Sequence, residues 1–156
     1  MERKTQKQFK TDIFGFPIII HNVVMIKRMG EWCPEINWNI LSSMAITALM
    51  TKPSRLTGGE MKFIRTYMNY TYREFGKIIG VAASTIKKWE KKDLEFTDMR
   101  LPMEKMIRMH ILQNCFKFEN KRALQEFRKY FQQIIDNQFN EDFTPLHFDY
   151  SELKAA

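Results

Sequence analysis

Two helix-start signals followed by a helix-stop signal constrain this chain more than any other feature. The pairs Thr57–Glu60 and Thr71–Glu74 both have the spacing T-x-x-E. In such a capping box the threonine side chain and the glutamate side chain each accept a hydrogen bond from a backbone N–H group of the other residue. Gly80 then follows where a helix must end, because glycine adopts the left-handed conformation without strain. The pattern predicts two short helices, over residues 57–68 and 71–79, and a tight turn after the second.

A third helix is predicted over residues 83–91, directly after the turn. Its inward positions are Ile86 and Trp89, with Ala82 one turn earlier. The opposite face is small and basic, and its members recur at steps of three and four residues, as Ser84, Lys87, Lys88 and Lys91. Residues with that spacing lie on one side of a helix, so this short helix presents a lysine-rich surface.

The positive charge of the chain is concentrated around these helices. The 156 residues have a formal net charge of +7. Between Arg55 and Lys92 there are nine Lys/Arg against three Glu, which leaves +6 in this segment and +1 in all the rest. A local excess of positive charge favours a polyanionic partner such as nucleic acid, through its long-range field and the release of counterions.

The flanking segments are read from their spacing and composition. Residues 1–12 are polar and basic and are interpreted as a frayed leader, and residues 13–29, rich in Ile, Val and Phe, predict one long or two short strands. Apolar side chains at helical spacing predict further helices within 37–50 and 103–118. Residues 119–139 predict a long amphipathic helix, whose stripe is Leu124, Phe127, Phe131 and Ile134.

Several function classes are excluded or disfavoured by what the sequence lacks. No apolar run approaches the roughly 20 residues that cross a bilayer, and no secretory cleavage site is visible, so a cytosolic location is expected. Cys33 and Cys115 form no CxxC pair and are expected to be free thiols. The scattered histidines give no zinc-ligand spacing, and no phosphate-binding loop or nucleophile–base set is present. We expect neither catalysis nor a metal nor a cofactor.

The segment "YTYREFGKIIGVAASTIKKWEKK" resembles the Xre/Cro-type helix-turn-helix family of DNA-binding repressors. The matching positions include the capping pair Thr71 and Glu74 and the motif core, which consists of Phe75, Gly80, Val81, Ile86 and Trp89. The preceding "KPSRLTGGEMKFIRTYM" is similar to the lead-in of MqsA- and HigA-type antitoxin regulators. The chain has Ala82 where the family often has a polar capping residue, and Tyr72 where it favours Gln. It lacks the CxxC pairs of the MqsA-type zinc module, so metal binding is not implied.

The resemblance implies that helix 83–91 enters the major groove of DNA with its N-terminal residues nearest the bases. Ala83 and Ser84 are small enough for close approach, and Lys87 and Lys88 are long enough to reach guanine or phosphate. The candidate DNA-binding residues are Thr71, Tyr72, Ala83, Ser84, Lys87, Lys88 and Lys91.

The fold predicted on this basis is mainly α. It is a lambda-repressor-like helix-turn-helix bundle with a short N-terminal β segment and a long C-terminal amphipathic helix. Three regions are expected: a leader and β segment over 1–36, a DNA-binding domain over 37–118 with its motif at 71–91, and an amphipathic helix with an acidic tail over 119–156.

Two functions remain open at the level of the sequence. The first is a sequence-specific transcriptional regulator that binds double-stranded DNA as a homodimer and reads an inverted repeat. The second is an antitoxin-type interaction module, which neutralises a toxin protein and autoregulates its operon. The acidic tail "NQFNEDFTPLHFDYSEL" is either a disordered end, a segment packed on its own domain, a segment that folds onto a basic partner, or a competitor of DNA for the basic helix.

Overall fold

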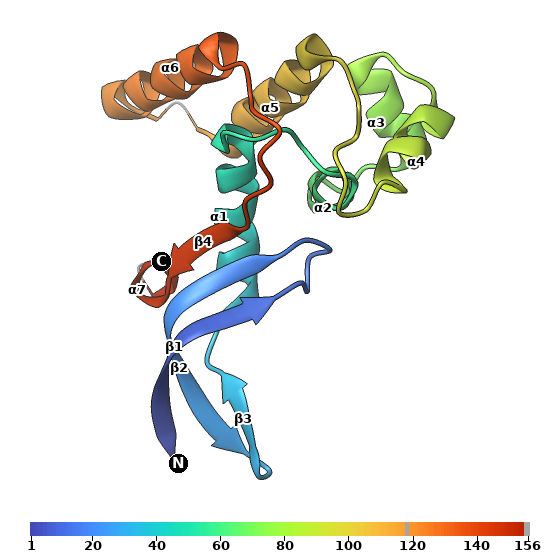
Figure 1. Cartoon of the computed structure of the whole chain (residues 1–156). Coiled ribbons are helices and arrows are strands. Elements are labelled where there is room, and N and C mark those ends of the chain that lie inside the picture. Colours follow the sequence, from blue (N-terminus) through green and yellow to red (C-terminus); the bar gives the residue numbers. More distant parts are fainter. Residues whose placement is uncertain (118, 155–156) are drawn as a thin grey trace. The chain divides into compact units, whose positions relative to one another are not determined.

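The computed structural model describes residues 1–117 and 119–154, which form two compact units (Figure 1). Unit 1 combines the N-terminal residues up to Ala45 with the C-terminal residues from Pro145. Unit 2 consists of Ile46–Thr144. The division into three regions with boundaries after residues 36 and 118 remains a prediction from the sequence.

Unit 1 is built on a four-stranded mixed sheet in which one strand pairs with all the others. The strands are β1 (Arg3–Thr11), β2 (Ile18–Arg28), β3 (Glu31–Pro34) and β4 (Leu146–Asp149). β2 pairs antiparallel with β1 and β3 and parallel with β4. A short helix, α7 (Tyr150–Leu153), follows β4 and begins with a capping box between Asp149 and Glu152. The last part of the chain therefore belongs to the same sheet as the first.

The buried face of β2 changes along the strand. Ile18 and Ile20 are buried in its first half, and Val23 and Met25 are buried in its second half. Strand side chains alternate between the two faces with a period of two, yet the buried positions change from even-numbered to odd-numbered residues between Ile20 and Val23. The change occurs around Asn22, whose φ of 58° is left-handed, while the pairing register with β1 is the same on both sides. The Asn22 side chain donates to Asp149 Oδ2 at 3.0 Å, which ties the irregular residue to the start of α7.

The prediction of a mainly α, lambda-repressor-like bundle with a short β segment is wrong. Over the residues that the structure describes, the fold is α/β, with 49% helix and 21% strand. Residues 1–12, interpreted from sequence as a frayed leader, contain the nine-residue strand β1. β1 carries charged and polar residues because it lies at the edge of the sheet, where lysines are common and burial is slight. Backbone hydrogen bonds fix its register with β2. The sequence of β1 has no apolar pattern from which this pairing could be predicted.

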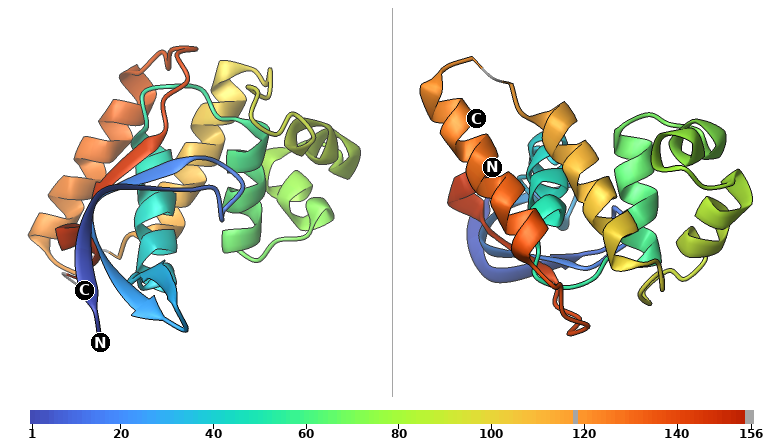
Figure 2. Two further views of the ribbon diagram at one scale, coloured as in Figure 1. Left: turned by 60° about the horizontal axis from the view of Figure 1, so that its bottom comes forward. Right: turned by 90° about the horizontal axis from the view of Figure 1, so that it is seen from above.

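Unit 2 is helical, and its helices carry the segments that the sequence singled out. They are α2 (Gly58–Tyr67), α3 (Tyr72–Ile79), α4 (Ala83–Glu90), α5 (Leu101–Cys115) and α6 (Lys121–Asp136). A further helix, α1 (Trp38–Thr51), begins in unit 1 and ends in unit 2. α2 and α3 both pack on α4, and α5 packs on α6 (Figure 2). In Figure 1, α3 and α4 lie at the end of unit 2 opposite to α6.

The stripe predicted on the long helix is only partly covered. Ile134 is buried and Phe127 half-buried, but Leu124 and Phe131 are 38% and 40% exposed. Ile135 beside them is 43% exposed. Side chains of this size gain stability when buried, so α6 presents an apolar surface in unit 2 that its own unit leaves partly open.

A buried ion network joins α5 to the start of α2. Glu104 is fully buried and accepts hydrogen bonds from Leu56 N at 2.8 Å and Arg55 Nε at 3.2 Å. Arg108, also fully buried, donates to the backbone carbonyls of Lys52 and Ser54, each at 2.7 Å. Its Nη2 lies 3.4 Å from Glu104 Oε2. Burial lowers the pKa of Arg108 to about 10, although Glu104 opposes that shift.

The structure also bears on the membrane and on the thiols. Among residues 1–117 and 119–154, no helix combines the length and the apolar character that crossing a membrane requires. Cys33, in unit 1, and Cys115, in unit 2, are both free thiols.

Candidate nucleic-acid interface

The helix starts and the turn predicted from sequence are confirmed. Both capping boxes are complete, and at the second of them Glu74 N donates to Thr71 Oγ1 at 3.1 Å. Gly80 ends α3 with a φ of 78°. α4 begins at Ala83, and its N-cap, Ala82, makes no side-chain hydrogen bond. The missing cap costs about 1 kcal/mol, which the packing of α4 on its neighbours must offset.

The turn between α3 and α4 is tight because residue 76 is glycine. Gly80 N and Val81 N both donate to the carbonyl oxygen of Gly76, at 2.8 and 2.9 Å. A Cβ atom built on Gly76 would lie 2.5 Å from the Val81 carbonyl oxygen. Real side chains do not approach a backbone oxygen this closely, so any larger residue must push the two helices apart.

A Gly76→Ala substitution is therefore expected to destabilise the protein by about 1–3 kcal/mol. Helix propensity alone predicts the opposite sign, because alanine is about 1 kcal/mol better than glycine within a helix. The free energy of unfolding from chemical denaturation measures the difference. Gly80→Asn is the matched control, because a Cβ atom added at position 80 would have nothing within 4 Å and asparagine tolerates the left-handed conformation. A stabilised Gly76→Ala protein would contradict the close approach.

A buried arginine on α2 holds the C-terminal end of α4. Arg65 Nη2 lies 3.0 Å from Glu90 Oε1, and the two side chains are only 10% and 5% exposed. Arg65 Nη1 also donates to the Tyr70 carbonyl at 2.9 Å. Burial raises the pKa of the Glu90 carboxyl, and the charge of Arg65 opposes the rise. The clamp links α2, the segment before α3, and α4, so it fixes the orientation of α4 within unit 2.

The same arginine reaches the candidate DNA-binding residue Tyr72. Its guanidinium carbon lies 4.0 Å from the centre of the Tyr72 ring, and Lys87 Nζ lies 5.2 Å from that ring. Cations at this distance are attracted to the face of an aromatic ring. Tyr72 therefore brings the start of α3 and the middle of α4 together, and it favours one arrangement of the Lys87 side chain.

The five residues of the predicted motif core differ in burial. Phe75 and Ile86 are fully buried, and the Phe75 ring stacks on Tyr70 with 5.9 Å between centroids. Trp89 and Val81 are half-buried. Gly80 is exposed at the turn, where its conformation rather than its burial matters. α4 is thus anchored mainly through Ile86 and through the Glu90 clamp.

The opposite face of α4 is open to solvent. Four of the candidate residues there are exposed, namely Ser84, Lys87, Lys88 and Lys91. Ala83 is half-buried at the first turn of the helix. On α3, Tyr72 is half-buried, and Thr71 is exposed at the N-cap. All seven candidate residues therefore lie on or next to the α3–turn–α4 segment.

Three further cations belong to this surface, although they are not among the candidate residues predicted from the sequence. Lys62 on α2 and Arg73 and Lys77 on α3 are exposed, and none has an ion pair among the residues that the structure describes. The spacing of Arg73 and Lys77 on the polar face of a predicted helix was the signal that could have found them. By contrast, Arg55, Arg65 and Lys92 of the same segment are paired with carboxylates. Within residues 55–92, the positive charge without an ion pair therefore lies on the exposed sides of α2, α3 and α4.

The described part of the chain contains no group of three or more His, Cys, Asp or Glu side chains arranged to hold a metal ion. Comparison with protein-family models, with curated proteins and with solved structures finds no match to this chain.

Proposed function

We propose that this chain is a sequence-specific transcriptional regulator that binds double-stranded DNA as a homodimer, with α4 in the major groove. The observation that carries the proposal is the exposed basic face of α4, which the buried Ile86 and the Arg65–Glu90 clamp support from behind. A helix of this kind fits the major groove, which is about 12 Å wide.

The residues divide into those that read bases and those that hold the backbone. Ser84 and Ala83 open α4, so they stand where a recognition helix approaches base edges. Lys87 and Lys88 extend from the next turn and reach guanine or phosphate. We expect Arg73 and Thr71, at the start of α3, to contact a phosphate, because the first N–H groups of a helix and a cation both attract an anion.

The dimer follows from how such helices read DNA. Two copies of one recognition helix bind half-sites related by two-fold symmetry. In unit 2 the half-exposed apolar face of α6, with Phe131 and Ile135, is a surface that a second copy would cover.

Selection of bound sequences from a random duplex pool tests the mode of binding. The expected result is an inverted repeat with half-sites about one helical turn apart. A single unpaired site would support DNA binding by a monomer, and the absence of any enrichment would remove the proposal.

The salt dependence of binding gives a second expected result. With about six to eight phosphate contacts in a dimer, the logarithm of affinity should fall against the logarithm of salt concentration with a slope near −5 to −7. Fluorescence anisotropy of a labelled duplex at several salt concentrations measures that slope. A slope near zero would mean that the exposed lysines of α4 do not contact phosphates.

The alternative function is an antitoxin module that neutralises a toxin protein and autoregulates its operon. The open apolar face of α6 favours it equally, because a toxin could cover the same side chains. The acidic tail is a weaker argument, since its end forms β4 and α7 within unit 1. A stable complex with the product of a neighbouring gene on co-expression would support this alternative, and a homodimer that excludes that product would oppose it.

A further inference from the structure

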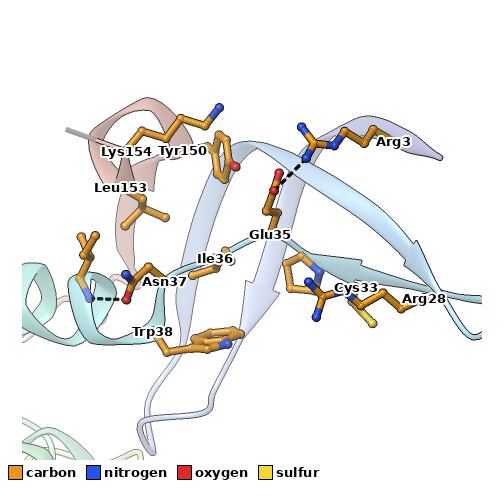
Figure 3. A pocket seen from close by; sticks show the side chains of 12 residues that line it. Arg3, Arg28, Cys33, Glu35, Ile36, Asn37, Trp38, Tyr150, Leu153 and Lys154 are labelled. Atoms are coloured by element: carbon orange, nitrogen blue, oxygen red, sulfur yellow. Dashed lines mark hydrogen bonds and ion pairs between the residues drawn. The ribbon is translucent and has the colours of Figure 1, made fainter. Parts of the chain in front are cut away.

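Unit 1 contains a pocket of about 700 Å³. Figure 3 shows its lining side chains, which come from the ends of β1 and β2, from β3 and the start of α1, and from α7. Pockets that take small organic molecules have volumes of about 300–1,000 Å³, so this one is large enough for such a ligand. Every residue of the lining belongs to unit 1.

The charges around the pocket do not balance. Its cations are Arg3, Arg28 and Lys154, and its only carboxylate among the lining residues is Glu35. Arg3 Nη2 lies 3.2 Å from Glu35 Oε1, so this pair is neutralised within the protein. Neither Arg28 nor Lys154 has an ion pair among the described residues, and Lys154 Nζ lies 4.9 Å from the centre of the Tyr150 ring. Two positive charges therefore remain for a ligand.

The walls of the pocket supply a second kind of contact. The Tyr150 ring is buried, and the Trp38 indole is half-buried at the start of α1. Burial raises the pKa of the Tyr150 hydroxyl, and Glu35, which accepts its hydrogen bond, raises it further. The hydroxyl therefore stays protonated, and its hydrogen bond is made to Glu35. Ile36 and Leu153 add aliphatic surface beside the two rings (Figure 3).

We propose that this pocket binds a small organic anion with a flat apolar body, whose acidic group pairs with Arg28 or Lys154 and whose body packs against Tyr150 and Trp38. Charge complementarity determines the sign of the ligand, and the aromatic walls determine the nature of its body. The proposal concerns unit 1 alone and does not depend on DNA binding by α4, so either proposal can fail without the other.

Titration of the full chain with 1-anilinonaphthalene-8-sulfonate, a fluorescent aromatic anion, tests the pocket. An Arg28→Gln/Lys154→Gln protein is expected to bind the probe about tenfold more weakly than the natural sequence, because neither cation is left to pair with the sulfonate. The matched control is Lys7→Gln/Lys10→Gln, which removes the same charge from exposed positions of β1 in the same unit. This control should leave the affinity unchanged.

The probe could instead bind the open apolar face of α6, and a second pair of variants separates the two sites. Phe131→Ser/Ile135→Ser is expected to retain the fluorescent complex, and Trp38→Ala is expected to weaken it. Loss of the complex in the α6 variant, together with unchanged affinity in the Arg28→Gln/Lys154→Gln protein, would overturn the proposal. Equal weakening by the β1 control would also overturn it, since that result would reflect total charge rather than the pocket.

Discussion

Replacing Lys87 and Lys88 together by alanine is expected to weaken binding to the selected operator by about 10³-fold or more at fixed salt. Each lysine of a dimer is present twice, so the double variant removes four contacts, and about 1 kcal/mol for each gives about 4 kcal/mol. Fluorescence anisotropy with the natural and variant proteins measures the change. Both lysines are exposed, and Lys87 Nζ lies 5.2 Å from the centre of the Tyr72 ring, so the fold should not change.

The matched control is Lys121→Ala/Arg122→Ala, which removes an adjacent pair of exposed cations from the start of α6 in the same unit. If this control weakens binding as much as the α4 variant, the effect comes from net charge, and α4 has no special role. The single Lys87→Ala variant then separates the two kinds of contact. Relaxed preference at one or two base positions indicates a base contact, whereas uniform weakening over all sequences indicates a phosphate contact.

Removing the buried carboxylate of Glu104 is expected to lower the free energy of unfolding by about 3–5 kcal/mol. In a Glu104→Leu protein the buried Arg108 loses its carboxylate, and the Leu56 N–H group loses its acceptor. An unpaired buried charge is far more destabilising than an apolar side chain at the same place. Chemical denaturation followed by the helical circular dichroism signal measures the change, because most helices belong to unit 2.

A double-mutant cycle distinguishes a true pair from two independent losses. Arg108→Met alone should also be strongly destabilising, because Glu104 then keeps a buried charge with Arg55 as its one ion-pair partner among the described residues. The Glu104→Leu/Arg108→Met protein should lose less than the sum of the two single changes, by about 1–3 kcal/mol. Additive losses would show that the two side chains do not interact in solution.

The candidate site could be located from the sequence because its signals are local. A capping box needs only four residues, and a left-handed helix end needs one glycine. The start of α3 at Thr71 and its end at Gly80 could therefore be predicted from the sequence. The exposed face of α4 followed from helical spacing alone. The clamp between Arg65 and Glu90 could not be found in this way, because it joins side chains 25 positions apart that meet only when α2 and α4 pack.

The fold class was predicted wrongly for the same physical reason. β4 has four residues and pairs with β2 more than 120 positions earlier in the chain, so no window of sequence contains both partners. β1 carries little apolar periodicity because it is an edge strand. Glu104 and Arg108 are charged residues on α5 that sequence reasoning would leave on the surface, yet the backbone around Ser54 and Leu56 buries them.

The place of β4 in unit 1 has a consequence for biosynthesis. Ribosomes deliver the chain from its amino end, and domains generally fold as units once they have emerged. Every residue of unit 2 is translated before β4, whereas the sheet of unit 1 needs Leu146–Asp149 beside β2 and closes only after these residues have left the exit tunnel. A nascent chain stalled before Pro145 would therefore already contain α4, the helix that we propose reads DNA. Strands β1, β2 and β3 would still lack β4.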